Sequence, residues 1–332
     1  MRAEAANRRI AEPGPLPWEP GATPLMLAPM QGITNRALRS LYIERVRPEV
    51  VFTEFMRIAR DSRRVLTATD RAEAAAGCSV PLVVQLIGPA SDNLVAAALA
   101  AQEQGARHLN LNMGCPFGRL SSSLSGGGML KAPEVLPKLL KDLRQAVSGS
   151  FSVKLRAGFS DPRQVFDLLP LLEEAGVDFL ILHPRTVAQK YQGAADHRLT
   201  AELVRATSLP VIANGDITTA ARGLEVLRET GAAGLMLGRG AIADPWLFER
   251  LRGRAPAQPT REQRLAELSA FLLELQQRYR ALFCGDTQIL YKLKEVLAFT
   301  GTEPALKEPV ARLRRAKNLE LFLDQARQLE HA

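Results

Sequence analysis

The residues best placed for chemistry lie in the stretch Asn110–Pro116, which reads Asn-Leu-Asn-Met-Gly-Cys-Pro. Apolar residues alternate with other residues up to this point, so we expect a strand that carries Asn110 and Asn112 on one face and ends just before Cys115. A thiol held at a strand end between a glycine and a proline is placed like a catalytic group. An isolated cysteine is, however, also among the residues most often buried and inert in a core.

Other polar residues also follow directly on short apolar runs. In a barrel of parallel strands, the C-terminal strand ends open on one mouth, and active sites are built there. Because so many strand ends carry polar groups, the pattern favours a functional site over an inert cysteine. These residues are Pro29, Met30 and Gln31; Thr53 and Glu54; Gln85; Asn112 with Cys115; Lys154 and Arg156; His183; Asn214, Gly215 and Asp216; and Gly238 and Arg239.

Short apolar runs alternating with longer amphipathic stretches must position these residues, a pattern typical of repeated βα units. The number and spacing of the runs predict an α/β fold, a closed (β/α)8 TIM barrel, rather than an open doubly wound sheet. Strands are expected at Leu25–Ala28, Val50–Thr53, Leu82–Leu86, His108–Asn112, Ser152–Arg156, Phe179–His183, Val211–Asn214 and Gly234–Leu237. Helices are expected between them at Ser91–Gln104, Pro133–Val147, Pro162–Ala175, Leu199–Thr207 and Thr218–Thr230.

The strand signal stops after Pro256. Amphipathic patterns continue at Arg261–Phe283, Thr287–Phe299 and Glu308–Glu330, so a small all-helical domain is expected over residues 255–332. The barrel would then occupy residues 24–254. The polar, proline-rich residues 1–23 are expected to form a flexible leader.

The formal net charge of +8 suggests a polyanionic partner. The predicted helical domain is only slightly positive, and the basic excess is stronger over residues 36–71. Within that segment, Arg57, Arg60 and Arg64 are expected to share a helix face near the barrel mouth. This face would either contact phosphates or simply be solvated.

The cysteines are Cys78, Cys115 and Cys284, an odd number without the spacing of a metal site or a disulfide framework. We therefore expect no metal and a reducing compartment, the cytoplasm. No apolar run reaches the roughly 18 residues of a membrane span, so no membrane association is expected. A monomer is expected.

In order and spacing, a set of motifs resembles the tRNA-dihydrouridine synthase family, whose members use FMN to reduce specific uridines in tRNA. The resemblance extends over nearly the whole chain from Leu25 onward. The motifs are Ala28-Pro29-Met30, Gln85, Asn112-x-Gly114-Cys115-Pro116, Lys154-x-Arg156-x-Gly158, His183-x-Arg185-Thr186, Tyr191, Asn214-Gly215-Asp216 and Gly238-Arg239-Gly240. Three further segments, Thr53-Glu54-Phe55, Gly126-Gly127-Gly128 and Gly285-Asp286-Thr287, resemble the bacterial subgroup that acts on uridine 16 of the D-loop.

The resemblance implies a role for each group of residues. Cys115 would give a proton to C5 of the uracil after hydride transfer from the flavin to C6, with NADPH or NADH as the reductant. The substrate would be contacted by Asn112, Arg156 and Tyr191, and the helical domain would hold the tRNA body. The flavin would be held by Pro29, Met30, Gln31, Gln85, Lys154, His183, Asn214, Gly215, Asp216, Gly238 and Arg239.

Physical chemistry agrees with part of this assignment. Barrels often bind a phosphate in the loops after strands 7 and 8, which here carry Asn214-Gly215-Asp216 and Gly238-Arg239-Gly240. Lys154 and Arg156 lie two residues apart on one strand, so we expect both to point inward and to need an anion. One residue departs from the family, which usually has an acid where Asn110 stands.

Two other functions fit parts of the pattern. An FMN barrel oxidoreductase that acts on a small pyrimidine would share the flavin residues. A tRNA-binding protein with an idle redox site would share the basic surface. The pyrimidine oxidoreductase would not explain the basic residues Arg57, Arg60 and Arg64 or the added helical domain.

Overall fold

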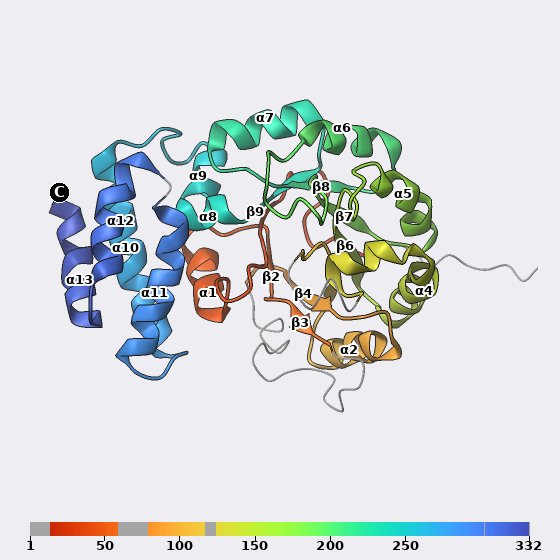
Figure 1. Ribbon diagram of the computed structural model, residues 1–332, viewed down its shortest axis with the longest axis horizontal. Helices are drawn as coiled ribbons and strands as arrows, with labels where there is room; N and C mark the ends of the chain where they lie inside the picture. Colours follow the sequence, from red (N-terminus) through yellow and green to blue (C-terminus); the bar gives the residue numbers. More distant parts are fainter. Residues whose placement is uncertain (1–13, 59–78, 117–123, 302, 332) are drawn as a thin grey trace, which may run out of the picture.

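The computed structural model describes residues 14–58, 79–116, 124–301 and 303–331. Within these ranges eight parallel strands close into a barrel, because β1 pairs with both β2 and β9 and β2 also pairs with β4 (Figure 1). The predicted TIM barrel is therefore confirmed. Its strands are β1 (Leu25–Leu27), β2 (Val50–Phe52), β4 (Leu82–Ile87), β5 (His108–Met113), β6 (Ser150–Arg156), β7 (Phe179–His183), β8 (Val211–Asn214) and β9 (Gly234–Leu237).

A further short strand, β3 (Met56–Arg57), lies against the end of β4. Met56 is buried and Arg57 is exposed, as the alternation of a strand requires. The expected helix face of Arg57, Arg60 and Arg64 is therefore wrong for Arg57, since burial of Met56 and Ile58 against the barrel favours an extended chain. Arg60 and Arg64 lie outside the described residues.

Apolar side chains fill the barrel interior, among them Phe52, Phe179 and Ile181. Trp18 packs on this cluster, with its ring edge-to-face on Phe179 at 4.9 Å between centroids. The backbone N–H of Gly14 donates to Asp178 Oδ1 at 2.8 Å. Residues 14–18, which we assigned to a flexible leader, are thus packed against the end of the barrel opposite the mouth.

Helices surround the barrel, and side-chain caps define where several of them begin. Asn35, Asp196 and Thr219 each accept a hydrogen bond from a backbone N–H in the first turn. The predicted helices are confirmed, except that Pro133–Val135 (η3) is a 3₁₀ turn before α4. The helices are α1 (Arg36–Arg45), α2 (Asp92–Glu103), α4 (Leu136–Ala146), α5 (Gln164–Glu174), α6 (His197–Ala206), α7 (Ala220–Thr230), α8 (Arg239–Ala243) and α9 (Leu247–Leu251), with the 3₁₀ turn η2 (Gly126–Lys131) before η3.

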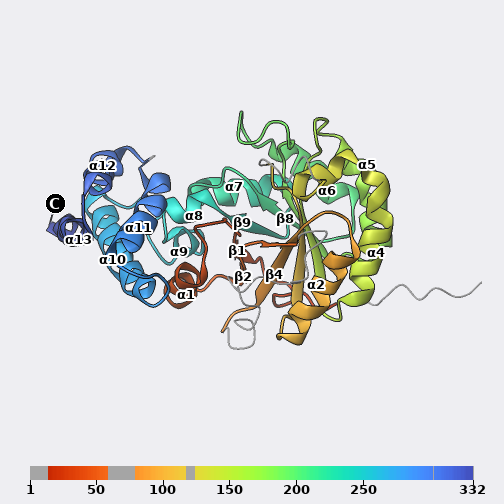
Figure 2. The ribbon, with the colours of Figure 1, turned by 60° about the horizontal axis from the view of Figure 1, so that its bottom comes forward.

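The C-terminal residues form a bundle that stands beside the barrel, with α1, α8 and α9 between the two (Figures 1 and 2). The single helix predicted over Glu308–Glu330 is two helices, because Asn318 caps a new start by accepting from the N–H of Leu321 at 2.9 Å. The elements are α10 (Arg261–Arg280), α11 (Asp286–Thr300), η4 (Pro304–Leu306), α12 (Lys307–Arg315), α13 (Leu319–Arg327) and η5 (Gln328–His331).

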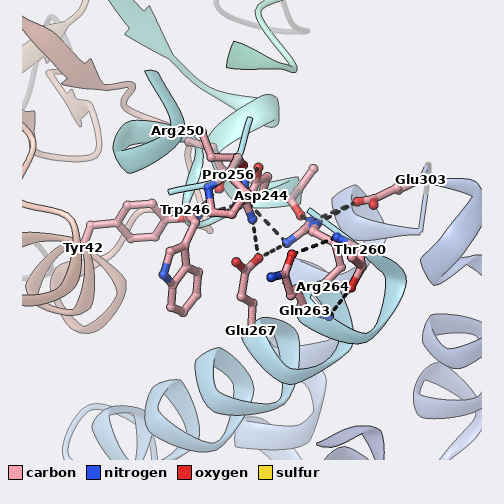
Figure 3. Close-up of polar contacts among 12 residues, drawn as sticks. Tyr42, Asp244, Trp246, Arg250, Pro256, Thr260, Gln263, Arg264, Glu267 and Glu303 are labelled. Carbon is pink, nitrogen blue, oxygen red and sulfur yellow. Dashed lines mark hydrogen bonds and ion pairs between the residues drawn. The ribbon is translucent and has the colours of Figure 1, made fainter. Parts of the chain in front are cut away.

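A shared core and an ion network join the bundle to the barrel. One apolar cluster runs from β1 and β9 through α1 into α10, α11 and α13. Beside it, the buried guanidinium groups of Arg250 and Arg264 both bind Glu267, as Figure 3 shows. Arg250 also pairs with Asp244 at 2.8 Å and Arg264 with Glu303 at 2.9 Å. The bundle is therefore held in one orientation relative to the barrel. Within the described ranges, no helix has the length and apolarity needed to cross a bilayer.

Candidate active site

The C-terminal strand ends open on a pocket of about 510 Å³. This is the face of a barrel on which active sites are built. Two described residues that we assigned to the flavin or to tRNA do not line the pocket: Gln85 is fully buried, and Arg57, assigned to tRNA, is exposed on β3. The predicted residues that line the pocket are Pro29, Met30, Gln31, Asn112, Cys115, Lys154, Arg156, His183, Tyr191, Asn214, Gly215, Asp216, Gly238 and Arg239.

Cys115 follows β5 in a turn that is held by side chains. Asn112 Oδ1 accepts hydrogen bonds from the backbone N–H groups of both Gly114 and Cys115, each at 3.0 Å. Arg156 Nε donates to the carbonyl of Gly114 at 2.9 Å. The thiol is partly exposed toward the pocket, so it can reach a bound molecule.

Arg156 is stabilised by backbone carbonyls and not by the bound anion that we expected. Its guanidinium is almost fully buried and donates to the backbone carbonyls of Gly114, Thr186 and Lys190. Carbonyl dipoles thus take the place of the anion that we expected the Lys154–Arg156 pair to need. Burial lowers the pKa of Arg156, and the Tyr191 ring lies 5.3 Å from its charge.

Lys154 is the cation that faces the pocket without such a set of carbonyl partners in the described contacts. Loss of water around the ammonium lowers its pKa to about 8, and the like charge of Arg156 adds to this shift. A group with this pKa changes its charge near neutral pH. It can therefore respond to an anion that binds beside it.

His183 is buried at the end of β7, and its tautomer is defined by Arg185. Arg185 Nη1 lies 3.0 Å from His183 Nε2. A guanidinium can only donate, so Nε2 must accept and the ring proton must be on Nδ1. Burial lowers the pKa of His183 far below its usual range, and the charges of Lys154, Arg156 and Arg185 lower it further. His183 is therefore a neutral ring that carries its only proton on Nδ1.

Asp216 links two arginines at the side of the pocket formed by the loops after β8 and β9. It pairs with both Arg185 and Arg239, and it accepts from the N–H of Ala195 at 2.8 Å. Burial by itself would raise the pKa of Asp216, but the hydrogen bonds from Arg185 and Ala195 lower it below the usual value. With two guanidinium groups on one carboxylate, this side of the pocket keeps a net positive charge.

Glycines let the two loops approach each other. A Cβ on Gly240 would lie 2.0 Å from the carbonyl oxygen of Ile217, so no other residue fits there. Gly215 has a φ of 120°, a conformation that favours glycine. Asn214 Nδ2 donates to the carbonyl of Met236 at 2.8 Å and ties the ends of β8 and β9 together. The result is a small, glycine-lined, positively charged corner, which suits an anion.

Comparison with known proteins gives the family. The model of the dihydrouridine synthase family matches residues 26–308, which include the barrel and much of the bundle. The chain belongs to the dihydrouridine synthase family.

Individual relatives of the family agree. A probable tRNA-dihydrouridine synthase of Rhodobacter capsulatus is 37% identical over 233 residues, which cover 69% of this chain and 70% of that protein. A tRNA-dihydrouridine synthase B of Vibrio vulnificus is 33% identical over 231 residues, or 68% and 70% of the two chains. Another protein of that name, from Pseudomonas aeruginosa, is 30% identical over 312 residues and 92% of each chain.

The pocket of this family member also contains residues that our sequence reasoning missed. Ile33 follows a strand end, and a criterion based on polar residues passes over it. Phe55 was named only within the segment Thr53-Glu54-Phe55 and was not assigned to the pocket. Phe299 comes from α11 and closes the pocket from the side of the bundle. Its sequence neighbours show only an amphipathic helix, so nothing local indicates that this ring reaches the barrel mouth.

Proposed function

We propose that the chain is an FMN-dependent tRNA-dihydrouridine synthase that reduces a uridine of the D-loop to 5,6-dihydrouridine with NADPH or NADH. The observation that carries the proposal is one pocket with a thiol on one side and a cationic, glycine-lined corner on the other. A uridine reductase needs both a proton donor and a place for an anionic flavin nucleotide. The family match supports this combination.

The residues of the pocket fit FMN. The phosphate would lie in the corner formed by Gly215, Gly238 and Arg239, where backbone N–H groups at the start of α8 add donors. Lys154 and the Nδ1–H of His183 would face the ring system as a cation and a neutral donor. Bound FMN supplies the hydride. Pro29, Met30, Gln31, Asn214 and Asp216 complete the set of pocket-lining residues assigned to it.

Gln85 takes a different place in this proposal. It is fully buried, and both ends of its amide are already hydrogen-bonded within the barrel. We therefore keep Gln85 below the flavin site, as a residue that supports the pocket floor.

Cys115 donates the proton in this proposal. The thiol would give a proton to uracil C5, and together with the hydride that FMN would supply to C6 the ring would gain two hydrogens. The turn held by Asn112 and Arg156 fixes the sulfur at the pocket wall. Tyr191, 44% exposed at the mouth, has the charges of Arg156 and Arg239 at 5.3 and 4.7 Å from its ring centroid and would stack on the base.

A flipped-out uridine of tRNA fits a pocket that opens between a barrel and a helical bundle. The bundle, residues 255–332, would hold the tRNA body, with the barrel of residues 24–254 as the catalytic part. Exposed basic residues at the end of α12, including Arg312, Arg314 and Arg315, support phosphate contact there. Arg57 remains assigned to tRNA, as do Arg60 and Arg64, although the latter two lie outside the described residues.

Uridine 16 is the position that we propose for modification. This proposal rests on the three subgroup segments, whereas two of the three relatives described above carry the suffix B. We further propose that the enzyme acts in the cytoplasm as a monomer.

An anaerobic experiment tests the function. The protein's flavin is reduced with NADPH, tRNA lacking dihydrouridine is added, and flavin reoxidation is followed, with free uridine and orotate as controls. Reoxidation by tRNA alone is expected. Reoxidation by a small pyrimidine would instead favour a metabolic oxidoreductase, and tRNA binding without reoxidation would indicate an idle redox site.

The Cys115→Ala variant tests the proton donor in the same assay. Reduction of the flavin by NADPH should be unchanged, because it does not need the thiol. Reduction of uridine should fall at least about a hundredfold, as expected for loss of a general acid. Unchanged turnover would remove Cys115 from the mechanism.

A further inference from the structure

Below the pocket, buried amide side chains form a hydrogen-bonded chain that ends on the backbone of Cys115. Its upper end is the pair of N–H groups of Gly114 and Cys115, which donate to Asn112 Oδ1. Asn112 Nδ2 in turn donates to Gln85 Oε1 at 2.9 Å.

The series of hydrogen bonds between side chains continues deeper into the barrel. Gln85 Nε2 donates to Asn110 Oδ1 at 2.8 Å, and Asn110 Nδ2 donates to Ser152 Oγ at 2.8 Å. The Ser152 hydroxyl donates to the backbone carbonyl of Leu109 at 3.3 Å. Gln85, Asn110 and Ser152 lie opposite one another on β4, β5 and β6, so the register of the barrel places them in one layer.

The direction of every link follows from the upper end. Backbone N–H groups can only donate, so Asn112 must turn its oxygen toward them and its nitrogen toward Gln85. Gln85 must then present oxygen to Asn112 and nitrogen to Asn110. The same reasoning turns the Asn110 nitrogen toward Ser152. A carbonyl at the lower end and two N–H groups at the upper end therefore fix all three amides.

Because its members are buried, the series of hydrogen-bonded side chains can control the geometry of the turn at Cys115. Gln85 and Ser152 are fully excluded from solvent, Asn110 is 1% exposed and Asn112 is 7% exposed. A buried amide that loses its partner has no water to replace it, so each member depends on the next. Removal of a lower link should therefore loosen the upper end.

We propose that Asn110 and Ser152 are positioning residues that hold the turn of Gly114 and Cys115, and thus the sulfur, through Gln85 and Asn112. Neither residue touches the pocket. Both lone pairs of Asn112 Oδ1 are used by the turn, so Asn112 can offer a ligand only an N–H. This inference rests on the proposed function only where catalysis is the readout.

The decisive variant is Asn110→Leu, which keeps the volume and removes both hydrogen bonds. In the FMN-loaded protein, the amide hydrogens of Gly114 and Cys115 should exchange at least about tenfold faster. Alkylation of Cys115 by iodoacetamide, measured peptide by peptide to separate it from the exposed Cys284, should change by a similar factor. The kcat for uridine reduction should fall about tenfold with little change in KM.

Asn110→Asp is the conservative rescue, because a carboxyl group can still accept from Gln85 Nε2, and the Ser152 hydroxyl can turn to donate to it, so both links of residue 110 are kept. Its exchange and alkylation rates should stay within about threefold of wild type. Ser150→Ala is the matched control. Ser150 is as buried as Ser152 and lies on the same strand, but its hydroxyl bonds to His108 Nδ1 at 2.8 Å and not to the amide chain. It should leave both rates unchanged.

Unchanged exchange and alkylation in Asn110→Leu would overturn the proposal, as would an equal effect of Ser150→Ala. If Asn110→Leu does not fold, Ser152→Ala provides the same test, since it deletes one hydroxyl at the lower end. Faster exchange in a protein that does not reduce tRNA would support the positioning role and contradict the proposed function instead.

Discussion

At the level of single residues, the cations of the pocket differ in the groups that they contact. Arg156 donates to backbone carbonyls, and Arg185 and Arg239 share the single carboxylate of Asp216, whereas Lys154 is left with a pKa of about 8. His183 is surrounded by these cations and stays neutral. Lys154 is thus the group whose charge is most open to control by a ligand.

Lys154 predicts a pH dependence for binding of the proposed FMN. An anion beside the ammonium stabilises the charged form and raises the pKa of Lys154 in the complex. Affinity should therefore be constant below about pH 8 and should fall by up to about tenfold per pH unit above it. Fluorescence titrations of FMN from pH 6.5 to 9.5 measure this. Lys154→Met should bind more weakly at pH 7 and show no step, and a step that persists in this variant would assign the titration to another group.

Arg185 predicts a single tautomer for His183. In the wild type, ¹⁵N spectra should show the proton on Nδ1 and no titration between pH 5 and 8. Arg185→Met removes the donor to Nε2, so signals of the Nε2–H tautomer should appear. Arg239→Met is the control, because Arg239 contacts Asp216 but not His183. A wild-type ring that titrates near pH 6.5 would contradict the assignment.

At the scale of elements, the pocket depends on how closely two loops approach. The loop after β8 and the start of α8 meet at Gly240, which lies against the carbonyl of Ile217. Gly238, two residues earlier, has room for a Cβ, whose nearest neighbours would be Ala28 and Met30 at 3.5 and 3.6 Å. A side chain at Gly240 would thus clash with the backbone, whereas a side chain at Gly238 would not.

A pair of alanine variants tests this difference. Gly240→Ala must displace backbone and should lower the free energy of unfolding by about 2–4 kcal/mol, measured by urea denaturation. Gly238→Ala should cost clearly less stability. It should instead weaken FMN binding, because its methyl group would lie beside Ala28 and Met30, which line the pocket. Similar losses of stability in both variants would contradict this distinction.

At the scale of the whole molecule, the bundle is fixed to the barrel and completes the pocket. Phe299 of α11 lines the pocket, so the orientation of the bundle affects the shape of the site. That orientation is held by the shared core and by the ion network of Figure 3, in which Glu267 serves two buried arginines. A more exposed pair on the same junction joins Arg278, whose side chain is 20% exposed, to Glu44, whose side chain is 62% exposed.

Glu267→Gln tests the network. Without the carboxylate, Arg250 and Arg264 keep Asp244 and Glu303 as partners but lose one shared charge, so stability should fall by about 2–3 kcal/mol. Glu44→Gln should cost less than about 1 kcal/mol, since its side chain is 62% exposed. Thermal and urea unfolding measure both variants. Equal losses would mean that the buried network does not anchor the bundle.

The barrel, its strand ends and most of the residues that line the pocket could be predicted from the amino-acid sequence. Strands buried on both faces are read from short apolar runs, and a barrel brings their polar ends to one mouth. The positions of Cys115, Lys154 and His183 followed from this local pattern alone. The family follows from motifs that stay in order along the chain.

The hydrogen-bond partners of these side chains, and the distant segments that complete the site, could not be predicted in this way. Arg156 and Asn112 were expected to contact substrate. Instead, Asn112 Oδ1 accepts from the backbone N–H groups of Gly114 and Cys115, and Arg156 donates to the backbone carbonyls of Gly114, Thr186 and Lys190. Arg57 lies in a strand, and Trp18 packs against the barrel interior. Phe299 reaches the pocket from another part of the chain. Hydrogen-bond partners and burial depend on contacts between segments far apart in sequence. Local sequence periodicity does not predict such contacts.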